Sequence, residues 1–458
     1  MLAPVPGEAE EARGGLLVLY GRLLSILLAG YLLFDKAFAY IHLPGTPVYV
    51  GEMVLAVGAL GTLAATGYLR IPLRDEPILA LLAAWFLWGL IRFVPGFGAN
   101  GINAVRDFAL CYYCFFGFFT VAALARAPDL LDRWLAQLSR FVPWLLIWLP
   151  FALILGSKVQ GPHVPFSGVS VFAHKPGNAA IAALVALGSI WLFPGTRSAR
   201  SRALWSILAL VVMALSATQN RGGLVGATAG ALIGLALIPS RERLRLIVKA
   251  VAVTVLGLFL ALSLSLRIPA QGRSFSASQL VTNVLSISGH RSGGLAGTVA
   301  GRDQLWSLVI EEEVAEGKLV DGFGFGVNLP YLVGDYQVTS GPDPLRSPHN
   351  SHFDVLARMG LIGAAFWIAL WLGWYWRMLT GCRRLAQRGL HARRQVAVLC
   401  LMTTTAVLVS SFFDPQLEGA QIAALLWTSF GVGVAVTSFR GWFGQRAPAP
   451  AAAGVEHL

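Results

Sequence analysis

Charged side chains are scarce in this sequence. Asp, Glu, Lys and Arg make up 13% of its 458 residues, whereas hydrophobic residues make up 56%. Soluble proteins carry charge on about 25% of their residues, so the composition argues against an ordinary soluble chain. The apolar residues gather into many runs of about 20 residues, the length that a helix needs to cross a bilayer. The sequence therefore predicts an all-α polytopic membrane protein.

Cysteine is also rare, and four residues do not suggest a disulfide framework. Cys111 and Cys114 form a C-x-x-C pattern, but it lies inside the apolar run 109–121, where packing is a better interpretation than redox chemistry. A typical secretory signal is missing as well. The first apolar run, 15–34, is too long for one and lacks a clear cleavage site, so we expect it to be a retained anchor.

The net charge of +12 could indicate a nucleic-acid partner. We expect none, because the basic residues cluster in short loops between apolar runs. That pattern has a topological cause: cytoplasmic loops of membrane proteins are rich in Lys and Arg. The expected partner is the lipid bilayer.

Twelve membrane spans are predicted. A tight break is expected between the seventh and the eighth, because Asn220, Gly222 and Gly223 lie there. The spans lie near residues 15–34, 48–68, 77–94, 107–124, 141–157, 178–194, 203–218, 222–239, 248–266, 355–376, 395–412 and 419–438.

The orientation follows from the loops. If the N-terminal side is inside, most arginines fall in inner loops, for example in 377–394. The short outer loops and their margins hold few basic residues: Lys36, Arg92, Arg106, Lys158, Lys175 and Arg221. This asymmetry predicts that both termini are cytoplasmic.

Four regions follow from this topology. Residues 1–266 carry spans one to nine, 267–354 form a large outer loop, 355–440 carry the last three spans, and 441–458 are a disordered cytoplasmic tail. The segment 129–140 is too polar to span, and its leucines recur at helical spacing, which predicts a helix on the inner membrane surface.

The large loop has internal structure. Residues 304–316 have a helical pattern, with Leu305, Leu308, Val309 and Val314 as apolar positions and Glu311, Glu312 and Glu313 largely on another side. Gly322, Gly324 and Gly326 follow and permit a close approach to a ligand. The loop ends with His349 and Asn350 ahead of an apolar run.

Charged and polar residues at the outer face are the candidate site, because charge near hydrocarbon is costly and often functional. Arg221 and Arg302 each precede a helix, where amide groups favour anions. His349 is the candidate base and Asp414 could orient a cation or a hydroxyl; His352 is an alternative to His349. A metal site of His349, His352 and Asp354 is a further alternative. Glu52 lies inside the second span and needs a partner, which the sequence does not name.

These pieces, in this order, resemble the superfamily of bacterial O-antigen ligases and O-antigen polymerases. The pattern is Arg221-Gly222, Gly301-Arg302 with Trp306, the glycines 322, 324 and 326, His349-Asn350, and the helix Leu356-Ala357-Arg358-Met359-Gly360-Leu361-Ile362-Gly363. One departure is Gln219-Asn220, where a serine commonly precedes the arginine. His352 falls at a variable position, which favours His349.

The resemblance implies glycan transfer from undecaprenyl diphosphate to a hydroxyl at the periplasmic face of the bacterial inner membrane. The outer face has no cluster of Asp and Glu of the kind that divalent ions need, so we expect no metal and no other cofactor. Arg302 and Arg221 would stabilise the diphosphate, and His349 would take the proton of the acceptor hydroxyl. Asn350, Gly324 and Asp414 are expected to bind substrate.

A ligase with lipid A–core as acceptor is the favoured interpretation. A polymerase that joins lipid-linked repeat units is the alternative, and protein O-glycosyltransferases share the core pattern. A transporter with twelve helices is a competing class, but such proteins often have repeated halves, and no repeat is visible here.

Overall fold

The computed structural model describes residues 6–65, 76–156, 158–159, 161–193, 195, 197–239, 243–245, 247–249, 267–268, 274–287, 294–334 and 346–438. Within these ranges the chain is almost entirely helical. The one sheet there pairs β1 (Arg267–Ile268) with β2 (Phe275–Ser276) in antiparallel fashion.

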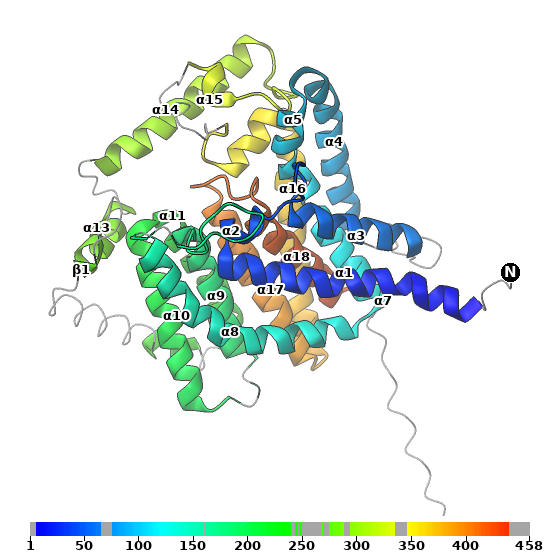
Figure 1. Ribbon diagram of the computed structural model, residues 1–458. Helices are drawn as coiled ribbons and strands as arrows, with labels where there is room; N and C mark the ends of the chain where they lie inside the picture. The colour runs from blue at the N-terminus through cyan, green and yellow to red at the C-terminus, as the bar shows by residue number, and fades with distance from the viewer. Residues whose placement is uncertain are drawn as a thin grey trace, which may run out of the picture.

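Seven helices are long and apolar enough to cross a membrane (Figure 1). They are α1 (Pro6–Phe34, apolar from Gly15), α4 (Pro77–Asn100), α8 (Asp129–Gly156), α10 (Ala199–Gln219), α16 (Ser351–Gln387), α17 (His391–Ser410) and α18 (Ala420–Thr437). An eighth would be the pair 102–112 and 115–126, which is bent by 46°. It consists of α5 (Ile102–Asp107), α6 (Ala109–Tyr112) and α7 (Phe115–Arg126).

Three further apolar helices are shorter: α3 (Val50–Ala65), α9 (Pro176–Leu192) and α11 (Arg221–Leu237). Together with the seven long helices and the bent pair, they coincide with every predicted span except 248–266, which lies almost wholly outside the described residues. The polytopic all-α class agrees with these helices, while the number twelve remains a prediction. The tail 441–458 also lies outside the described residues.

Two expectations about helix boundaries have different outcomes. The break between α10 and α11 is where the sequence places it, because Asn220 ends α10 and its side chain accepts a hydrogen bond from Gly223 N at 2.7 Å. The separate surface helix 129–140 is wrong, since these residues are the first half of α8. Their leucines pack against α1, and Trp134 Nε1 donates to Gly21 O at 3.0 Å. The apolar face is therefore covered by protein rather than by lipid.

The helix α18 is the centre of the bundle. Every residue from Ala420 to Thr437 is buried, and α7, α16 and α17 pack around it. On the other side of α17 lie α9 and α11. At the periphery, Glu52 of α3 accepts hydrogen bonds from the hydroxyls of Tyr112 and Tyr113 at 3.0 and 2.8 Å, which supplies the partners that the sequence left open.

All four cysteines are free and buried. Cys111 lies 3.7 Å from the sulfur of Met359, and its neighbours are packed side chains. The C-x-x-C pattern is therefore part of the core packing.

The 294–334 segment caps one end of the molecule, at the top of Figure 1, beside the start of α16 and the end of α4. It contains α14 (Gly294–Ala315) and α15 (Leu329–Leu332). Two short helices complete the described elements, namely α2 (Lys36–Ala39) and α13 (Ala277–Ile287). The predicted helix 304–316 is present and begins earlier, but its buried face differs from the prediction. Glu313 is fully buried, and Val314 is 58% exposed.

A kink in α16 attaches the glycine-rich loop to the bundle. Gly360 has φ +65° and ψ −170°, which essentially only glycine adopts. The kink frees backbone groups of α16, and the segment 319–324 takes them as partners. Leu361 N donates to Leu319 O and Ile362 N to Val320 O, while Phe323 N donates to Ala357 O and Gly324 N to Arg358 O, at 2.8–3.2 Å.

Candidate functional site

The starts of three helices meet the α17–α18 connection, residues 411–419. Ser351, the first residue of α16, donates its backbone N–H to Ser411 O at 2.9 Å and accepts Leu417 N at its hydroxyl at 3.1 Å. Gly222 of α11 packs on Phe413, and the next residue, Gly223, packs on Gly177 of α9. Only glycines permit these approaches, because a Cβ there would overlap its neighbour. The positive ends of three helix dipoles therefore lie at one place.

Four ionisable side chains gather at these helix starts: Lys175, Arg302, His349 and Asp414, which we call the outer cluster. Lys175 precedes α9, and its Nζ lies 3.9 Å from Asp414 Oδ2. Burial is the main reason that the pKa of the Arg302 guanidinium is lowered, and the Asp414 carboxylate opposes that effect. Arg302 and His349, predicted as site residues 47 positions apart, thus act on each other and on Asp414.

The imidazole of His349 is held in its neutral form. Burial lowers its pKa most, the positive charges of Arg302 and Lys175 lower it further, and Asp414 raises it. Its Nδ1 is buried, and no hydrogen bond to that atom is found within the described part of the chain. A neutral imidazole can accept a proton, so the electrostatics suit a general base.

The backbone of His349 is strained. Its φ is +59°, in the left-handed region that few residues other than glycine adopt. Such outliers persist only where the surroundings determine them. On one side, Trp306 Nε1 of α14 donates to Pro348 O at 2.8 Å. On the other side, Asn350 Oδ1 accepts His352 N at 2.9 Å and Phe353 N at 3.1 Å, which caps α16. The backbone of His349 is thus held between two anchored residues.

Arg221 opens α11 and is half-buried. The contact of Gly222 with Phe413 brings Arg221 beside the segment that carries Asp414. Four of the six predicted site residues, Arg221, Arg302, His349 and Asp414, therefore lie around the helix starts. Asn350 is there too, with its side-chain oxygen used in the cap.

Gly324 is placed differently. Its backbone N–H donates to Arg358 O, and a Cβ on it would lie 3.2 Å from Arg92 O. Arg92 also pairs with Asp321 at 2.7 Å and donates to Gly322 O. Within the described residues, the contacts of Gly324 are with α4 and α16 rather than with the outer cluster. The glycines fasten the loop to the bundle.

A buried ion network, which the sequence did not predict, supports this loop. Asp107 Oδ2 lies 2.9 Å from Arg358 Nη1 and 3.3 Å from Arg346 Nη2, and it accepts Gly326 N at 3.0 Å. Arg358 also pairs with Asp354 at 3.3 Å. In the sequence, Asp107 could have been noticed as a lone acidic residue at the start of the fourth predicted span. Its partners could not have been identified in this way, because they lie more than 200 positions away.

His352 has a structural role. Its Nδ1 accepts Trp367 Nε1 at 2.9 Å, so its Nε2 carries the proton and donates to Leu408 O at 2.8 Å. Both ring nitrogens are engaged, and Asp354 is paired with Arg358. His352 and Asp354 therefore bind other protein groups, and these contacts do not favour a metal site shared with His349. In the part of the chain that the structure describes, no group of three His, Cys, Asp or Glu could hold a metal.

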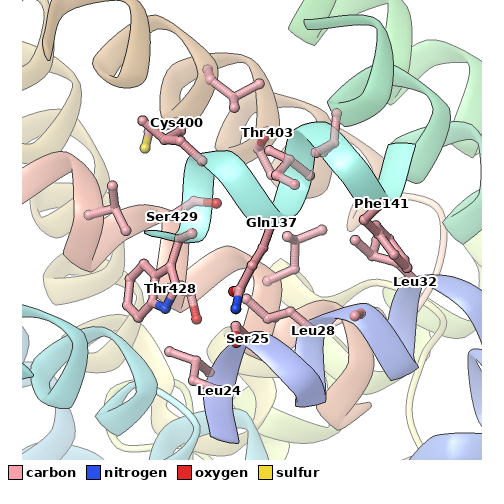
Figure 2. Close-up of a pocket in the computed structure, with 18 of the residues that line it drawn as sticks. Leu24, Ser25, Leu28, Leu32, Gln137, Phe141, Cys400, Thr403, Thr428 and Ser429 are labelled. Carbon is pink, nitrogen blue, oxygen red and sulfur yellow. The ribbon is translucent and has the colours of Figure 1, made fainter. Parts of the chain in front are cut away.

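An apolar cavity of about 360 Å³ lies elsewhere, between α1, α8, α9, α17 and α18 (Figure 2). Leu28 and Leu32 of α1 and Phe141 of α8 are among its apolar lining residues, and Gln137, Thr403 and Thr428 are among its few polar side chains. None of the outer-cluster residues lines it. Its apolar wall does not suit a charged diphosphate.

Comparison with known proteins finds a match for the middle part of the chain. Residues 207–368 match the family model described as O-Antigen ligase. The matched range contains Arg221, Arg302 and His349, whereas Lys175 and Asp414 lie outside it. No curated protein matches the chain. The family consists of glycosyltransferase-like membrane enzymes that use lipid-linked glycans. The match over residues 207–368 therefore shows that this part of the chain is similar to the O-antigen ligase and O-antigen polymerase superfamily.

Proposed function

We propose that this protein is an O-antigen ligase. It transfers a polysaccharide from undecaprenyl diphosphate to a hydroxyl of lipid A–core, at the periplasmic face of the bacterial inner membrane. The observation that carries the proposal is the outer cluster: a neutral, half-buried His349 beside Arg302, at a point where three helix starts and Arg221 meet.

The donor's diphosphate would bind where these helices begin. Charge develops on the phosphate oxygens as the glycosidic bond breaks, and a preorganised positive environment lowers the barrier. Arg302 and Arg221 offer planar, permanently charged donors that can bind phosphate through two parallel hydrogen bonds. The positive ends of the three helix dipoles add to this attraction.

The acceptor would be activated by His349. The imidazole takes the proton of the attacking hydroxyl as its oxygen bonds to the anomeric carbon and undecaprenyl diphosphate leaves. Direct displacement of this kind inverts the anomeric centre. Because the pKa of His349 is lowered, the imidazole is ready to accept a proton at neutral pH. Asp414 would orient the acceptor or the imidazole, since it acts on His349 and Arg302 alike.

Asn350 and Gly324 would support the site indirectly, by holding the segments around it. Asn350 acts by holding the start of α16. Gly324 acts by holding the glycine-rich loop to α16, through the hydrogen bond from its N–H to Arg358 O. The proposed orientation follows from the basic inner loops, because Lys and Arg favour the cytoplasmic side. It puts the starts of α9, α11 and α16 outside, facing the periplasm.

The test is reconstitution of the purified protein with lipid-linked O-polysaccharide and lipid A–core. A product that forms only when lipid A–core is present supports the ligase. Longer lipid-linked chains formed without lipid A–core would indicate the polymerase instead, and no glycan transfer with either acceptor would refute the glycosyltransferase.

Two variants assign the chemistry. His349→Gln is expected to lower kcat by at least about a hundredfold, the lower range for a general base. Arg302→Lys should lower it by a similar factor, because the paired hydrogen bonds are lost. His391→Gln and Arg133→Gln are controls, since both side chains are exposed at other helix starts. Loss of activity in the controls would contradict the assignment.

The scheme needs no metal ion. EDTA is therefore expected to leave activity unchanged. Complete loss in EDTA, with recovery on adding one divalent ion, would overturn this part of the proposal.

A further inference from the structure

Lys175 is fixed to the bundle by its backbone. Its N–H donates to Asp35 Oδ2 at 2.6 Å, and the other oxygen of the same carboxylate accepts Asn178 Nδ2 at 2.9 Å. Asp35 is fully buried. This carboxylate takes up amide groups at the start of α9, so the position of Lys175 is set before any substrate binds.

The side chain of Lys175 extends from this anchor to the outer cluster. The 3.9 Å between its Nζ and Asp414 Oδ2 exceeds the 2.7–2.9 Å of a direct charged hydrogen bond. The Lys175 side chain is 33% exposed and that of Asp414 22%. A lysine ammonium has three donors, so one loose ion pair leaves it able to take a better partner.

The net charge of the site matches that of the donor's diphosphate only when Lys175 is counted as a third cation. Arg221, Arg302 and Lys175 are positive, Asp414 is negative, and His349 is neutral. Among these five side chains the positive charges exceed the negative by two, which matches in magnitude the charge of a doubly ionised diphosphate diester. Without Lys175, the carboxylate of Asp414 would cancel half of what the two arginines offer.

We propose that Lys175 is a third phosphate-binding cation, which exchanges its ion pair with Asp414 for an oxygen of the donor's diphosphate. This inference rests on the proposed function for the identity of the ligand. When the exchange occurs, Asp414 loses its lysine but still acts on His349 and Arg302. Binding of the donor is thereby linked to the basicity of the residue that activates the acceptor.

The first test is binding of undecaprenyl diphosphate to the full-length protein in nanodiscs. Lys175→Met is expected to raise Kd about tenfold, equivalent to about 1.4 kcal/mol. Lys175→Arg should stay within about threefold of the wild type, because the cation is kept. Lys158→Met is the matched control, since Lys158 is an exposed lysine on the preceding connection, and it should bind as the wild type does.

Two results would overturn the inference: wild-type affinity in Lys175→Met, or equal weakening in Lys175→Arg. The same measurement separates this inference from the proposed function. If the wild type fails to transfer glycan, yet Lys175→Met still weakens binding of undecaprenyl diphosphate, the reaction is wrong and the phosphate contact stands.

The second test is the pH profile of kcat/KM, which reports the free enzyme. His349 is faced by Arg302 from α14, by Lys175 from the start of α9, and by Asp414 from the α17–α18 connection. Lys175→Met removes a charge that lowers the pKa of His349 and leaves the carboxylate that raises it. The acidic limb of the profile should therefore move to higher pH, and Asp414→Asn should move it to lower pH. An unchanged limb in Lys175→Met would refute the link to His349.

Discussion

The hydrogen bond from Trp306 to Pro348 is the contact that most directly positions His349. Trp306 Nε1 donates to Pro348 O at 2.8 Å, and its ring stacks on Phe353 with 5.8 Å between centroids. Trp306→Phe removes the donor and keeps an aromatic ring. The variant therefore changes how the residue before His349 is held and leaves the ionisable groups of the site in place.

The size of the effect follows from two energies. The left-handed conformation of His349 costs roughly 1–2 kcal/mol. A net hydrogen bond contributes about 0.5–1.5 kcal/mol, so the Trp306 bond offsets much of that strain. Since about 1.4 kcal/mol is a factor of ten in rate, Trp306→Phe should lower kcat about threefold to tenfold. The KM for the donor should change little, because Arg302 and Arg221 remain.

The assay is steady-state glycan transfer in nanodiscs, with Trp134→Phe as the matched control. Trp134 makes the same kind of bond, from Nε1 to Gly21 O at 3.0 Å, between α8 and α1. That variant should keep the wild-type kcat. The reasoning is refuted if Trp306→Phe turns over like the wild type, or if both variants lose activity equally.

Three further predictions concern stability, measured as thermal unfolding in detergent. His352→Phe should lower the free energy of unfolding by about 2 kcal/mol or more, because Trp367 Nε1 and the carbonyl of Leu408 lose their hydrogen-bond partner. The folded fraction should keep its activity. Loss of activity without loss of stability would refute the structural role. Burial raises the pKa of Glu313 from 4.5 to about 7. Because the folded-state pKa is above the unfolded value, wild-type stability should fall as pH rises from about 4.5 to 7, by at most about 3.4 kcal/mol. A Glu313→Gln variant with the same pH dependence would contradict this. Gly360→Ala should lower stability by several kcal/mol, because the kink and the four backbone hydrogen bonds to 319–324 depend on this glycine. Gly373→Ala in the same helix is the control and should cost less, because the added Cβ meets only the end of a flexible side chain. Equal stability of the two variants would refute the argument.

The positions of the helices could be predicted because their causes are local. A run of apolar residues is a property of one segment, and so is the break at Asn220, where a side chain caps the helix that follows it. The same holds for the helical pattern around Leu305 and Val309, both of which are buried in α14. Which side of α14 is covered depends on distant segments, and for that reason the prediction for Glu313 and Val314 is wrong.

The candidate site could be predicted in part. Arg221, Arg302, His349 and Asp414 stand out because charged and polar side chains are rare at the outer face, and the ordered motifs add weight to Arg221, Arg302 and His349. Lys175 looked like a loop lysine, since the sequence does not show that Asp35, 140 positions earlier, fixes its backbone. Asp107 and Arg358 were missed for a similar reason, because an ion pair between two spans has no local pattern.

The place of the site follows from the alternation of spans, under the proposed orientation. A chain that starts inside begins every second span at its outer face, so the positive dipole ends of those helices all lie outside. The helices α9, α11 and α16 are of this kind, and glycines at 177, 222 and 223 bring α9 and α11 against each other and against the α17–α18 connection. Arg221 is the first residue of α11 and Lys175 is the residue before α9, and at both places a cation is repelled by the helix dipole rather than stabilised. An anionic ligand removes that repulsion, so the arrangement gains stability from a bound diphosphate in a way that a site of solvated lysines would not.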